Sequence, residues 1–199
     1  FDIYLKKGGF DIVIGNPPFI EHKKLKDIAY LLKPNYRVYS GSSDISAYFF
    51  ELGFNLLKKQ GILQYISSNK FFNTGYGKEL RKYLLENRIN FLVNFEQVEV
   101  FEGVLVSSVI VSDTKINPSI SHNFRYTEFY QDKNWKANFN EHKILSSKSI
   151  KQSSFDDSEW SFANDEALFL RKKTEAAGIK IKDYQEIEIK RGVTTGYDP

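Results

Sequence analysis

The sequence of 199 residues contains no cysteine, which excludes disulfide bonds and thiolate metal sites. Its three histidines, His22, His122 and His142, lie far apart and follow no ligand spacing. We therefore expect no metal site, although a site built from carboxylates alone stays open. No apolar run approaches the roughly 18–20 residues of a membrane span, and the first residues lack the pattern of a secretory signal. These absences predict a cytoplasmic protein with no membrane partner.

Methionine is also absent, and the chain stops at Pro199 just after a glycine-containing turn. We therefore expect a piece cut from a longer protein. The composition, 41% apolar and 27% charged, is that of a globular chain with enough apolar material for a core. The length fits one large domain, or one domain plus a fragment. The net charge of +3 permits nucleic-acid binding without arguing for it. Nothing in the sequence indicates the oligomeric state.

The chain is organised around one stretch, residues 10–19. An apolar run from Ile12 to Ile14 ends at Gly15, and Asn16, Pro17, Pro18 and Phe19 follow. Consecutive apolar positions predict a buried strand of a mostly parallel sheet. The prolines fix their own φ angles and push Asn16 toward an extended conformation. The sequence thus predicts a stiff loop at the carboxyl end of a strand, where open α/β sheets bind ligands.

The chemistry of this loop suits a planar ring that carries an amino group. Asn16 offers a side-chain carbonyl acceptor, and its backbone carbonyl and that of Pro17 are acceptors held in fixed directions. Phe19 offers a flat apolar face for stacking. A base flipped out of DNA is a ligand of this kind. A bare Asn-Pro-Pro sequence is more often only a turn, so the loop needs support from the rest of the chain.

That support comes from a family resemblance. Residues Asn16-Pro17-Pro18-Phe19 resemble the catalytic motif of amino-methyltransferases that use S-adenosylmethionine, in the form found in adenine-specific DNA methyltransferases. A second block is similar to the same family: an apolar strand over residues 61–66, then Asn69-Lys70-Phe71, Tyr76-Gly77 and Leu80-Arg81. In this resemblance Lys70, Tyr76 and Arg81 are candidates for contacts with DNA phosphates, the common partners of such side chains. A solvated surface role is the competing interpretation, above all for Arg81.

The segment between the two blocks predicts a helix over residues 44–59. Asp44 is its expected N-cap, and Ile45, Phe49, Leu52 and Leu56 form one apolar stripe. In the family this helix begins beside the cofactor pocket, so the resemblance makes Asp44 and Tyr48 candidates for cofactor binding. An earlier helix is expected over residues 21–32, ended by Pro34. Its lysines indicate a solvated face or phosphate contacts.

Two further strands, residues 89–95 and 104–111, are joined by a short connection. They predict an antiparallel hairpin at a sheet edge, the feature that the methyltransferase fold adds to a doubly wound sheet. Phe101, in the connection, is the aromatic nearest to the family position that packs on the flipped base, but core packing explains it better. The fold class is therefore expected to be α/β: the C-terminal half of a Rossmann-like, S-adenosylmethionine-dependent methyltransferase sheet with an antiparallel edge hairpin.

The rest of the chain predicts a strand over residues 124–130, a polar segment over 144–161 and a helix over 164–177. Residues 179–198 then resemble the start of a target-recognition domain, through Arg191-Gly192-Val193 and Thr195-Gly196-Tyr197. We expect residues 1–115 to be the catalytic half of a methyltransferase domain, 116–178 a connecting segment and 179–199 the start of the recognition domain. This order implies the gamma arrangement of the family.

The resemblance implies S-adenosylmethionine-dependent methylation of the adenine amino group in double-stranded DNA, with the adenine flipped out. It is closest to large single-chain type II (IIG) restriction–modification enzymes that also carry an endonuclease, with a stand-alone methyltransferase next. The glycine-rich cofactor loop of the family is missing from this chain, so we expect half of a cofactor site and no activity of this piece alone. Three alternatives stay open: a DNA-binding specificity module without catalysis, an amino-methyltransferase acting on RNA or protein glutamine, and a nonfunctional remnant.

Overall fold

The computed structural model describes residues 7–18, 20, 25, 27–103, 106–139, 147–162, 170, 173–174 and 176–179. The chain divides into two compact units, residues 1–160 and 161–199. All strands and helices named below belong to the first unit. Within the described ranges, no helix combines the length and apolarity needed to cross a membrane.

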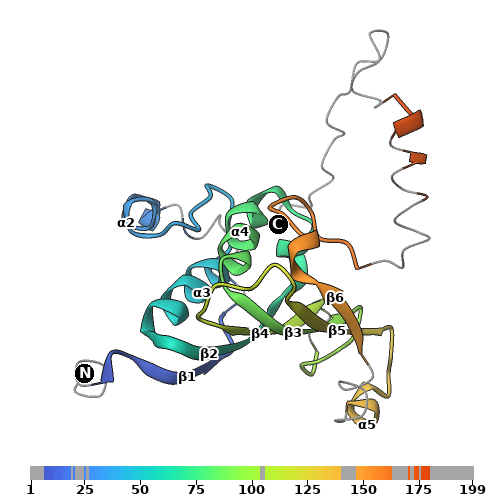
Figure 1. The fold of residues 1–199 in the computed structure, drawn as a ribbon, viewed down its shortest axis with the longest axis horizontal. Helices are drawn as coiled ribbons and strands as arrows, with labels where there is room; N and C mark the ends of the chain where they lie inside the picture. The colour runs from blue at the N-terminus through green and yellow to red at the C-terminus, as the bar shows by residue number, and fades with distance from the viewer. Residues whose placement is uncertain are drawn as a thin grey trace, which may run out of the picture. The chain divides into compact units, whose positions relative to one another are not determined.

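A six-stranded mixed sheet forms the centre of the first unit, as Figure 1 shows. Along the sheet its strands are β1 (Phe10–Gly15), β2 (Leu57–Ser68), β4 (Ser108–Thr114), β3 (Arg88–Glu96), β5 (Asn123–Tyr130) and β6 (Lys148–Lys151). The pairs β1–β2 and β3–β5 are parallel, whereas β4 is antiparallel to both β2 and β3. Strands β1, β2, β3 and β5 therefore point the same way, and their carboxyl ends share one edge of the sheet.

The expected antiparallel pair is confirmed, but its place in the sheet differs from the prediction. β4 lies between β2 and β3, so the pair is inside the sheet, and β1 and β6 are the outer described strands. β5, expected from its alternation, pairs with β3, and β6 lies in the polar segment. Sequence alternation shows that a segment is a strand but not which strands it pairs with, because that choice depends on contacts far apart in the chain.

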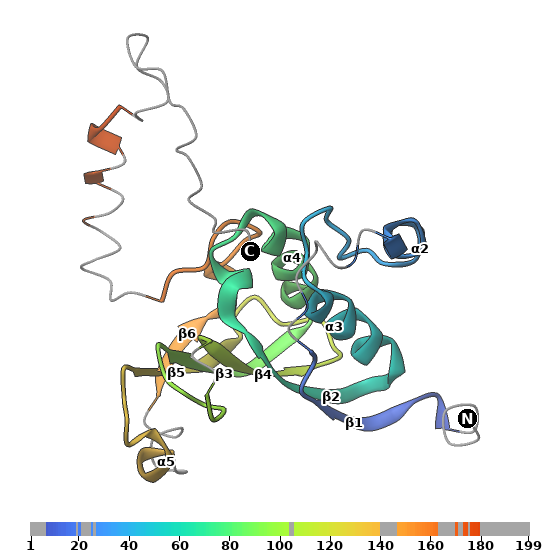
Figure 2. The same cartoon turned by 180° about the vertical axis from the view of Figure 1, so that it is seen from behind.

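The helices lie on both sides of the sheet. Helices α3 (Ile45–Leu56) and α4 (Lys78–Leu85) cover one face and the short α5 (Trp135–Asn138) lies on the other, as Figure 2 shows. Helix α2 (Ala29–Asn35) stands away from the sheet and buries none of its residues. Single 3₁₀ turns complete the unit: η2 (Asn69–Phe72), η3 (Gly75–Gly77) and η4 (Gln152–Ser154).

The core is built from aromatic and aliphatic side chains on the two faces. Phe50 and Phe54 of α3 are fully buried on the face of α3 and α4, together with Leu63 of β2. On the opposite face, Phe95 stacks on Phe129 at 5.3 Å between ring centroids, and Trp135 meets Phe95 edge-on at 5.1 Å. Such aromatic pairs add to the stability gained from apolar burial.

Three local predictions need correction. The stripe of α3 is displaced by one or two positions, because Ala47, Phe50 and Phe54 are buried while Leu52 is 41% exposed. Helix α3 ends at Leu56, earlier than expected, and β2 follows directly. Pro34 lies inside the last turn of α2 and does not end the helix before it.

Candidate active site

The Asn-Pro-Pro loop follows β1 at the shared carboxyl edge of the sheet, as predicted. The side chain of Asn16 is exposed, Pro17 is buried and Pro18 is exposed, while Phe19 lies outside the described residues. Gly15 immediately before the loop packs on Tyr65 of β2, since a Cβ at position 15 would lie 2.8 Å from Cε1 of that ring. The loop thus starts from a backbone held against an aromatic ring and presents an amide to solvent.

The strand before the loop is more exposed than its apolar sequence predicts. Ile12 and Ile14 are 57% and 75% exposed, and among the described strands β1 pairs only with β2. Within the described part of the chain, the apolar sequence of β1 therefore does not correspond to burial on both faces of the sheet.

The exit from the loop is tied to the start of α3. The backbone N–H of Ile45 donates to the carbonyl of Ile20 at 3.0 Å. Asp44 caps α3 as predicted: its Oδ1 accepts a hydrogen bond from the Ser46 N–H at 2.8 Å and another from the Ser46 hydroxyl. Its second oxygen, Oδ2, has the Tyr76 hydroxyl at 3.5 Å. The structure therefore joins two candidates from different predicted groups, Asp44 and Tyr76.

Tyr48 lies one turn further along α3 and is almost fully buried. Its ring meets that of Tyr36 edge-on at 5.3 Å, and Tyr39 lies 6.4 Å away. Burial raises the pKa of the Tyr48 hydroxyl to about 12, helped by Tyr39. The hydroxyl is therefore a neutral group at physiological pH. Tyr48 therefore contributes an aromatic ring and a neutral hydroxyl group to this region, and no charge.

Lys70 and Tyr76 follow the carboxyl end of β2. Lys70 sits in η2 with an exposed side chain, while Tyr76 in η3 is half-buried. The Ser68 hydroxyl caps η2 by accepting from the Lys70 N–H at 3.3 Å. Because β1 and β2 are parallel neighbours, these residues and Asn16 share the carboxyl edge of the sheet.

Arg81 does not fit its predicted role as a phosphate contact. It is only 2% exposed, and its guanidinium donates to backbone carbonyls: Phe71 at 2.5 Å, Thr74 at 2.9 Å, and Asp157 at 2.9 Å and 3.1 Å. Burial lowers the pKa of this guanidinium, opposed by the charges of Glu159, Asp157 and Asp156. Arg81 therefore holds η2, η3 and the segment around Asp157 together, and its hydrogen bonds point into the protein.

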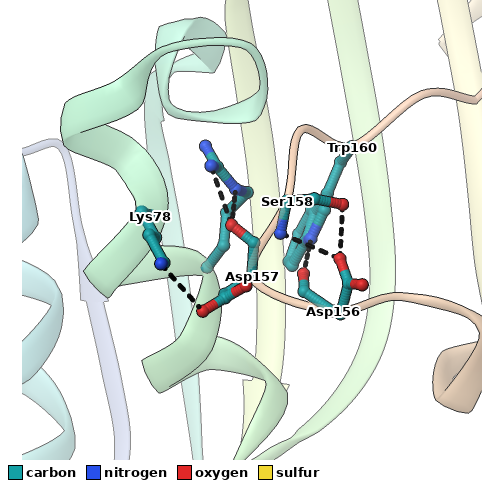
Figure 3. Close-up of polar contacts among 6 residues, drawn as sticks. Lys78, Asp156, Asp157, Ser158 and Trp160 are labelled. Carbon is teal, nitrogen blue, oxygen red and sulfur yellow. Dashed lines mark hydrogen bonds and ion pairs between the residues drawn. The ribbon is translucent and has the colours of Figure 1, made fainter.

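The partners around Arg81 form a polar junction at the protein surface. Figure 3 shows Lys78 reaching the carboxylate of Asp157, an ion pair of 3.5 Å, and Ser158 and Trp160 folded over Asp156. The Trp160 indole donates to the carbonyl of Asp156 at 2.9 Å, and its backbone N–H donates to the carbonyl of Phe72. This junction fixes residues 156–160, the end of the polar segment, against η2 and α4.

A chain of polar groups that no sequence pattern predicted lies at the same edge, with Asn69, Asn94 and Tyr126 buried, Glu96 half-buried and Glu128 exposed. Asn69 donates its side-chain N–H groups to Asn94 Oδ1 at 2.9 Å and to Glu96 Oε2 at 2.7 Å. Asn94 donates in turn to Glu128 Oε1 at 3.0 Å and to the Tyr126 hydroxyl at 3.3 Å. A signal was available: Asn94 and Glu96 alternate with Val93 and Phe95 directly after the apolar run Phe91–Val93 of the same strand.

Comparisons with known proteins place the chain in a family. The family model described as Eco57I restriction-modification methylase matches residues 1–101, which is more than half of the chain. The chain belongs to the Eco57I restriction-modification methylase family. The match includes the Asn-Pro-Pro loop, α3, β2 and β3.

Two curated relatives extend the match beyond residue 101. The type II methyltransferase M.BstVI of Geobacillus stearothermophilus is 28% identical over 95% of the chain and 36% of its own length. The type II restriction enzyme and methyltransferase RM.Eco57I of Escherichia coli is 29% identical over 76% of the chain and 15% of its own length. The chain therefore spans about a third of one relative and a smaller part of the other.

A solved structure agrees with the fold. The modification subunit of a putative type I restriction enzyme from Vibrio vulnificus superposes with a TM-score of 0.54 at 14% identity, over 82% of this chain and 40% of that one. The Rossmann-like methyltransferase sheet predicted from the sequence is confirmed, with the correction that its antiparallel pair lies inside the sheet.

Proposed function

We propose that this chain carries the base-binding part of an S-adenosylmethionine-dependent methyltransferase that modifies the amino group of adenine in DNA. The observation that carries the proposal is the exposed Asn16, presented by a Pro-Pro loop at the carboxyl end of β1. Membership of a restriction-modification methylase family supports methylation as the reaction. The same membership supports DNA as the substrate.

The loop suits the recognition of an amino group because its acceptors are held before the ligand arrives. Gly15 rests on the Tyr65 ring, and the Pro17 ring is buried, so the backbone between them has little freedom. In the proposal, Asn16 Oδ1 and the Pro17 carbonyl accept the two amino hydrogens of a flipped adenine. Phe19 stacks on the ring of the base. Preorganised acceptors of this kind cost no reorganisation during the reaction.

The two acceptors favour attack by the amino nitrogen, because they hold its hydrogens and leave its lone pair directed away from the ring plane. A bond forms between that nitrogen and the transferred methyl carbon, the carbon–sulfur bond of the donor breaks, and the extra amino proton leaves to solvent. S-Adenosylmethionine, when bound, supplies the electrophilic methyl group on a positively charged sulfur. The contribution of the loop is positioning and charge stabilisation, with no side-chain base of shifted pKa.

The residues at the start of α3 fit the donor groups of such a cofactor. Within the described part of the chain, Oδ2 of Asp44 has one long contact, from the Tyr76 hydroxyl at 3.5 Å, so it keeps capacity to accept from hydroxyl or ammonium donors. Tyr48 adds an aromatic wall with a neutral hydroxyl. In the proposal Asp44 and Tyr48 hold one side of the cofactor, and a segment outside this chain holds the other side.

The remaining features extend the proposal to the whole protein. Lys70 and Tyr76 lie at the carboxyl edge beside the loop, where they would contact the DNA backbone next to the flipped base. We infer that residues 179–199, of which the structure describes only Ile179, begin a target-recognition domain, after a methyltransferase part (1–115) and a connecting segment (116–178) that adds strands β5 and β6 to the same sheet. The dual name of RM.Eco57I supports a fused nuclease.

The decisive experiment measures methyl transfer from labelled S-adenosylmethionine by the protein in its full natural length. DNA of mixed sequence, RNA and a protein acceptor serve as separate substrates. The wild type is compared with Asn16→Ala and with a matched control, Asn123→Ala, which removes an exposed amide at the amino end of β5. We expect label on adenine of DNA, a loss of about a hundredfold or more in Asn16→Ala, and wild-type activity in the control.

Other outcomes would overturn the proposal in distinct ways. Label on RNA or on protein glutamine would replace the substrate. Undiminished label in Asn16→Ala would remove the loop from the mechanism. DNA binding without any methyl transfer would leave a specificity module.

A further inference from the structure

A continuous chain of hydrogen bonds crosses the carboxyl ends of three strands. It runs from Asn69, directly after β2, to Asn94 and Glu96 on β3, and on to Tyr126 and Glu128 on β5. Asn69 and Asn94 are 8% and 4% exposed, so both amides lie almost entirely out of water. Buried amides require matched partners, and here each N–H finds an acceptor.

Carboxylates at both ends fix the direction of the chain. An ionised carboxylate can only accept hydrogen bonds. Glu128 therefore accepts from both of its neighbours in the chain of hydrogen bonds. The side-chain N–H of Asn94 donates to it at 3.0 Å, and the Tyr126 hydroxyl donates to it at 2.8 Å. Asn94 then turns its carbonyl to Asn69, and the two N–H groups of Asn69 are divided between Asn94 and Glu96. The carbonyl oxygen of Asn69 consequently faces away from the network.

Glu96 ties the same network to the loop between β3 and β4. Its Oε1 accepts from the Ser107 hydroxyl at 3.0 Å, and that hydroxyl accepts from the Gln97 N–H at 3.1 Å. The backbone N–H of Asn69 donates to the backbone carbonyl of Ser107 at 3.1 Å. These hydrogen bonds join three segments of the chain: the end of β2, the end of β3 and the residues just before β4.

The residues that follow Asn69 and Glu96 in the chain face solvent at the carboxyl edge of the sheet. Lys70 follows Asn69 directly and is exposed. Gln97 follows Glu96, holds a left-handed φ of 53°, and begins one wall of a cavity of about 780 Å³ that also includes Val98, Glu99 and Val100. A non-glycine residue at positive φ is strained, and it persists where its surroundings determine that conformation.

We propose that Asn69 is a positioning residue for methyl transfer. Its amide, oriented by Asn94 and Glu96, sets the Lys70 segment and the β3–β4 loop at a fixed distance from each other, so that both meet the DNA substrate in register. The inference rests on the proposed function. A polar network in which every buried amide N–H has an acceptor specifies one arrangement of the segments that it joins, which fits a role in setting geometry.

The test uses the full-length protein and the change Asn69→Asp, which places a carboxylate against Glu96 and Asn94 Oδ1. We expect kcat/KM for DNA to fall at least about tenfold at a temperature well below unfolding, with KM for S-adenosylmethionine unchanged. The double variant Asn69→Asp with Glu96→Gln exchanges donor and acceptor, so that the amide at position 96 donates to the carboxylate at position 69. It should recover most of the lost kcat/KM.

The matched control is Asn90→Asp, which makes the same change near the amino end of β3, where Asn90 contacts Ser112 and Thr114. It should leave kcat/KM for DNA near the wild-type value. Wild-type kinetics in Asn69→Asp would overturn the positioning role, as would a loss that only follows the fall in Tm or that Asn90→Asp shares. Absence of methyl transfer in the wild type would instead refute the proposed function, so the two failures are distinguishable.

Discussion

The ring of Tyr65 lies directly against Gly15, the residue that precedes the Asn-Pro-Pro loop. A Cβ built at position 15 would come within 2.8 Å of Cε1 and 3.2 Å of Cδ1 of that ring. The Tyr65 ring is itself confined, since a Cβ at Gly53 of α3 would lie 2.5 Å from its hydroxyl oxygen. Two glycines thus enclose one tyrosine between β1 and α3, and the position of Asn16 depends on this packing.

Gly15→Ala should therefore damage the site more than its size suggests. The added methyl group must displace either the β1 backbone or the enclosed Tyr65 ring. We expect destabilisation of about 1–3 kcal/mol and a loss of methyl transfer larger than the loss of folded protein. Thermal unfolding and single-turnover methylation measure the two effects. Gly41→Ala, where a Cβ would meet nothing within 4 Å, is the control and should be close to neutral.

Asp44 has two separable roles that a pair of variants can distinguish. Asn caps helices about as well as Asp, whereas Ala does not. Asp44→Asn should therefore keep the stability of α3 and raise KM for S-adenosylmethionine about tenfold, because the ligand loses a charged acceptor. Asp44→Ala should show the same rise and also lose about 1 kcal/mol of stability. An unchanged KM in Asp44→Asn would reduce this residue to a helix cap.

Arg81→Leu should lower the stability of the protein and leave the electrostatic part of DNA binding unchanged. The carbonyls of Phe71, Thr74 and Asp157 would lose their buried donor, at a total cost of about 3 kcal/mol. The salt dependence of DNA binding by the folded variant should match that of the wild type, whereas removing a phosphate contact lowers the slope by about one. Arg37→Leu is the control: its ion pair with Glu86 is exposed, so the change in stability should stay below about 1 kcal/mol.

Asp113 should make stability depend on pH. This carboxyl on β4 is fully buried, and burial raises its pKa well above the usual value, only partly opposed by the Thr114 N–H and the charge of Arg88. A raised pKa means that the folded state holds the proton more tightly than the unfolded state. The free energy that Asp113 contributes to folding is therefore fully present below about pH 4, the pKa of this group in the unfolded state. It is lost as pH rises toward the pKa of the folded state.

Asp113→Asn removes this titration. Thermal unfolding across pH 4–8 should show the wild type losing stability with rising pH more steeply than the variant, and the variant more stable at pH 8. Asp27→Asn, at an exposed position of the chain, should leave the wild-type profile unchanged. Parallel profiles for wild type and Asp113→Asn would contradict this assignment.

The predictable part of the fold was local in origin. The apolar run closed by Gly15 and the prolines located β1, the apolar run that begins at Gly61 located the second half of β2, and the Asp44 cap located the start of α3. The stripe of α3 was misplaced because Glu51, charged in the sequence, is buried and accepts the Val38 N–H at 3.0 Å. Arg81 was misplaced for the same reason, since its partners are backbone carbonyls, which the amino-acid sequence does not reveal.

The nonlocal part was not predictable from patterns. Nothing in residues 108–114 indicates that they lie between β2 and β3. The polar network of Asn69 and Glu96 likewise depends on which strands are neighbours. The Asn16 loop was recognised because its chemistry is contained within four adjacent residues, although Phe19 lies outside the described part of the chain.

The position of β4 sets a minimum length for any foldable piece of this protein. β2 and β3 have no contact as neighbouring strands until residues 108–114 arrive between them, so during synthesis the two halves of the sheet must wait for a segment made after both. A polypeptide trimmed at residue 101, where the family match ends, would leave β2 and β3 with bare facing edges. Boundaries for expression should therefore follow the neighbouring strands of the sheet and not the end of the family-model match at residue 101.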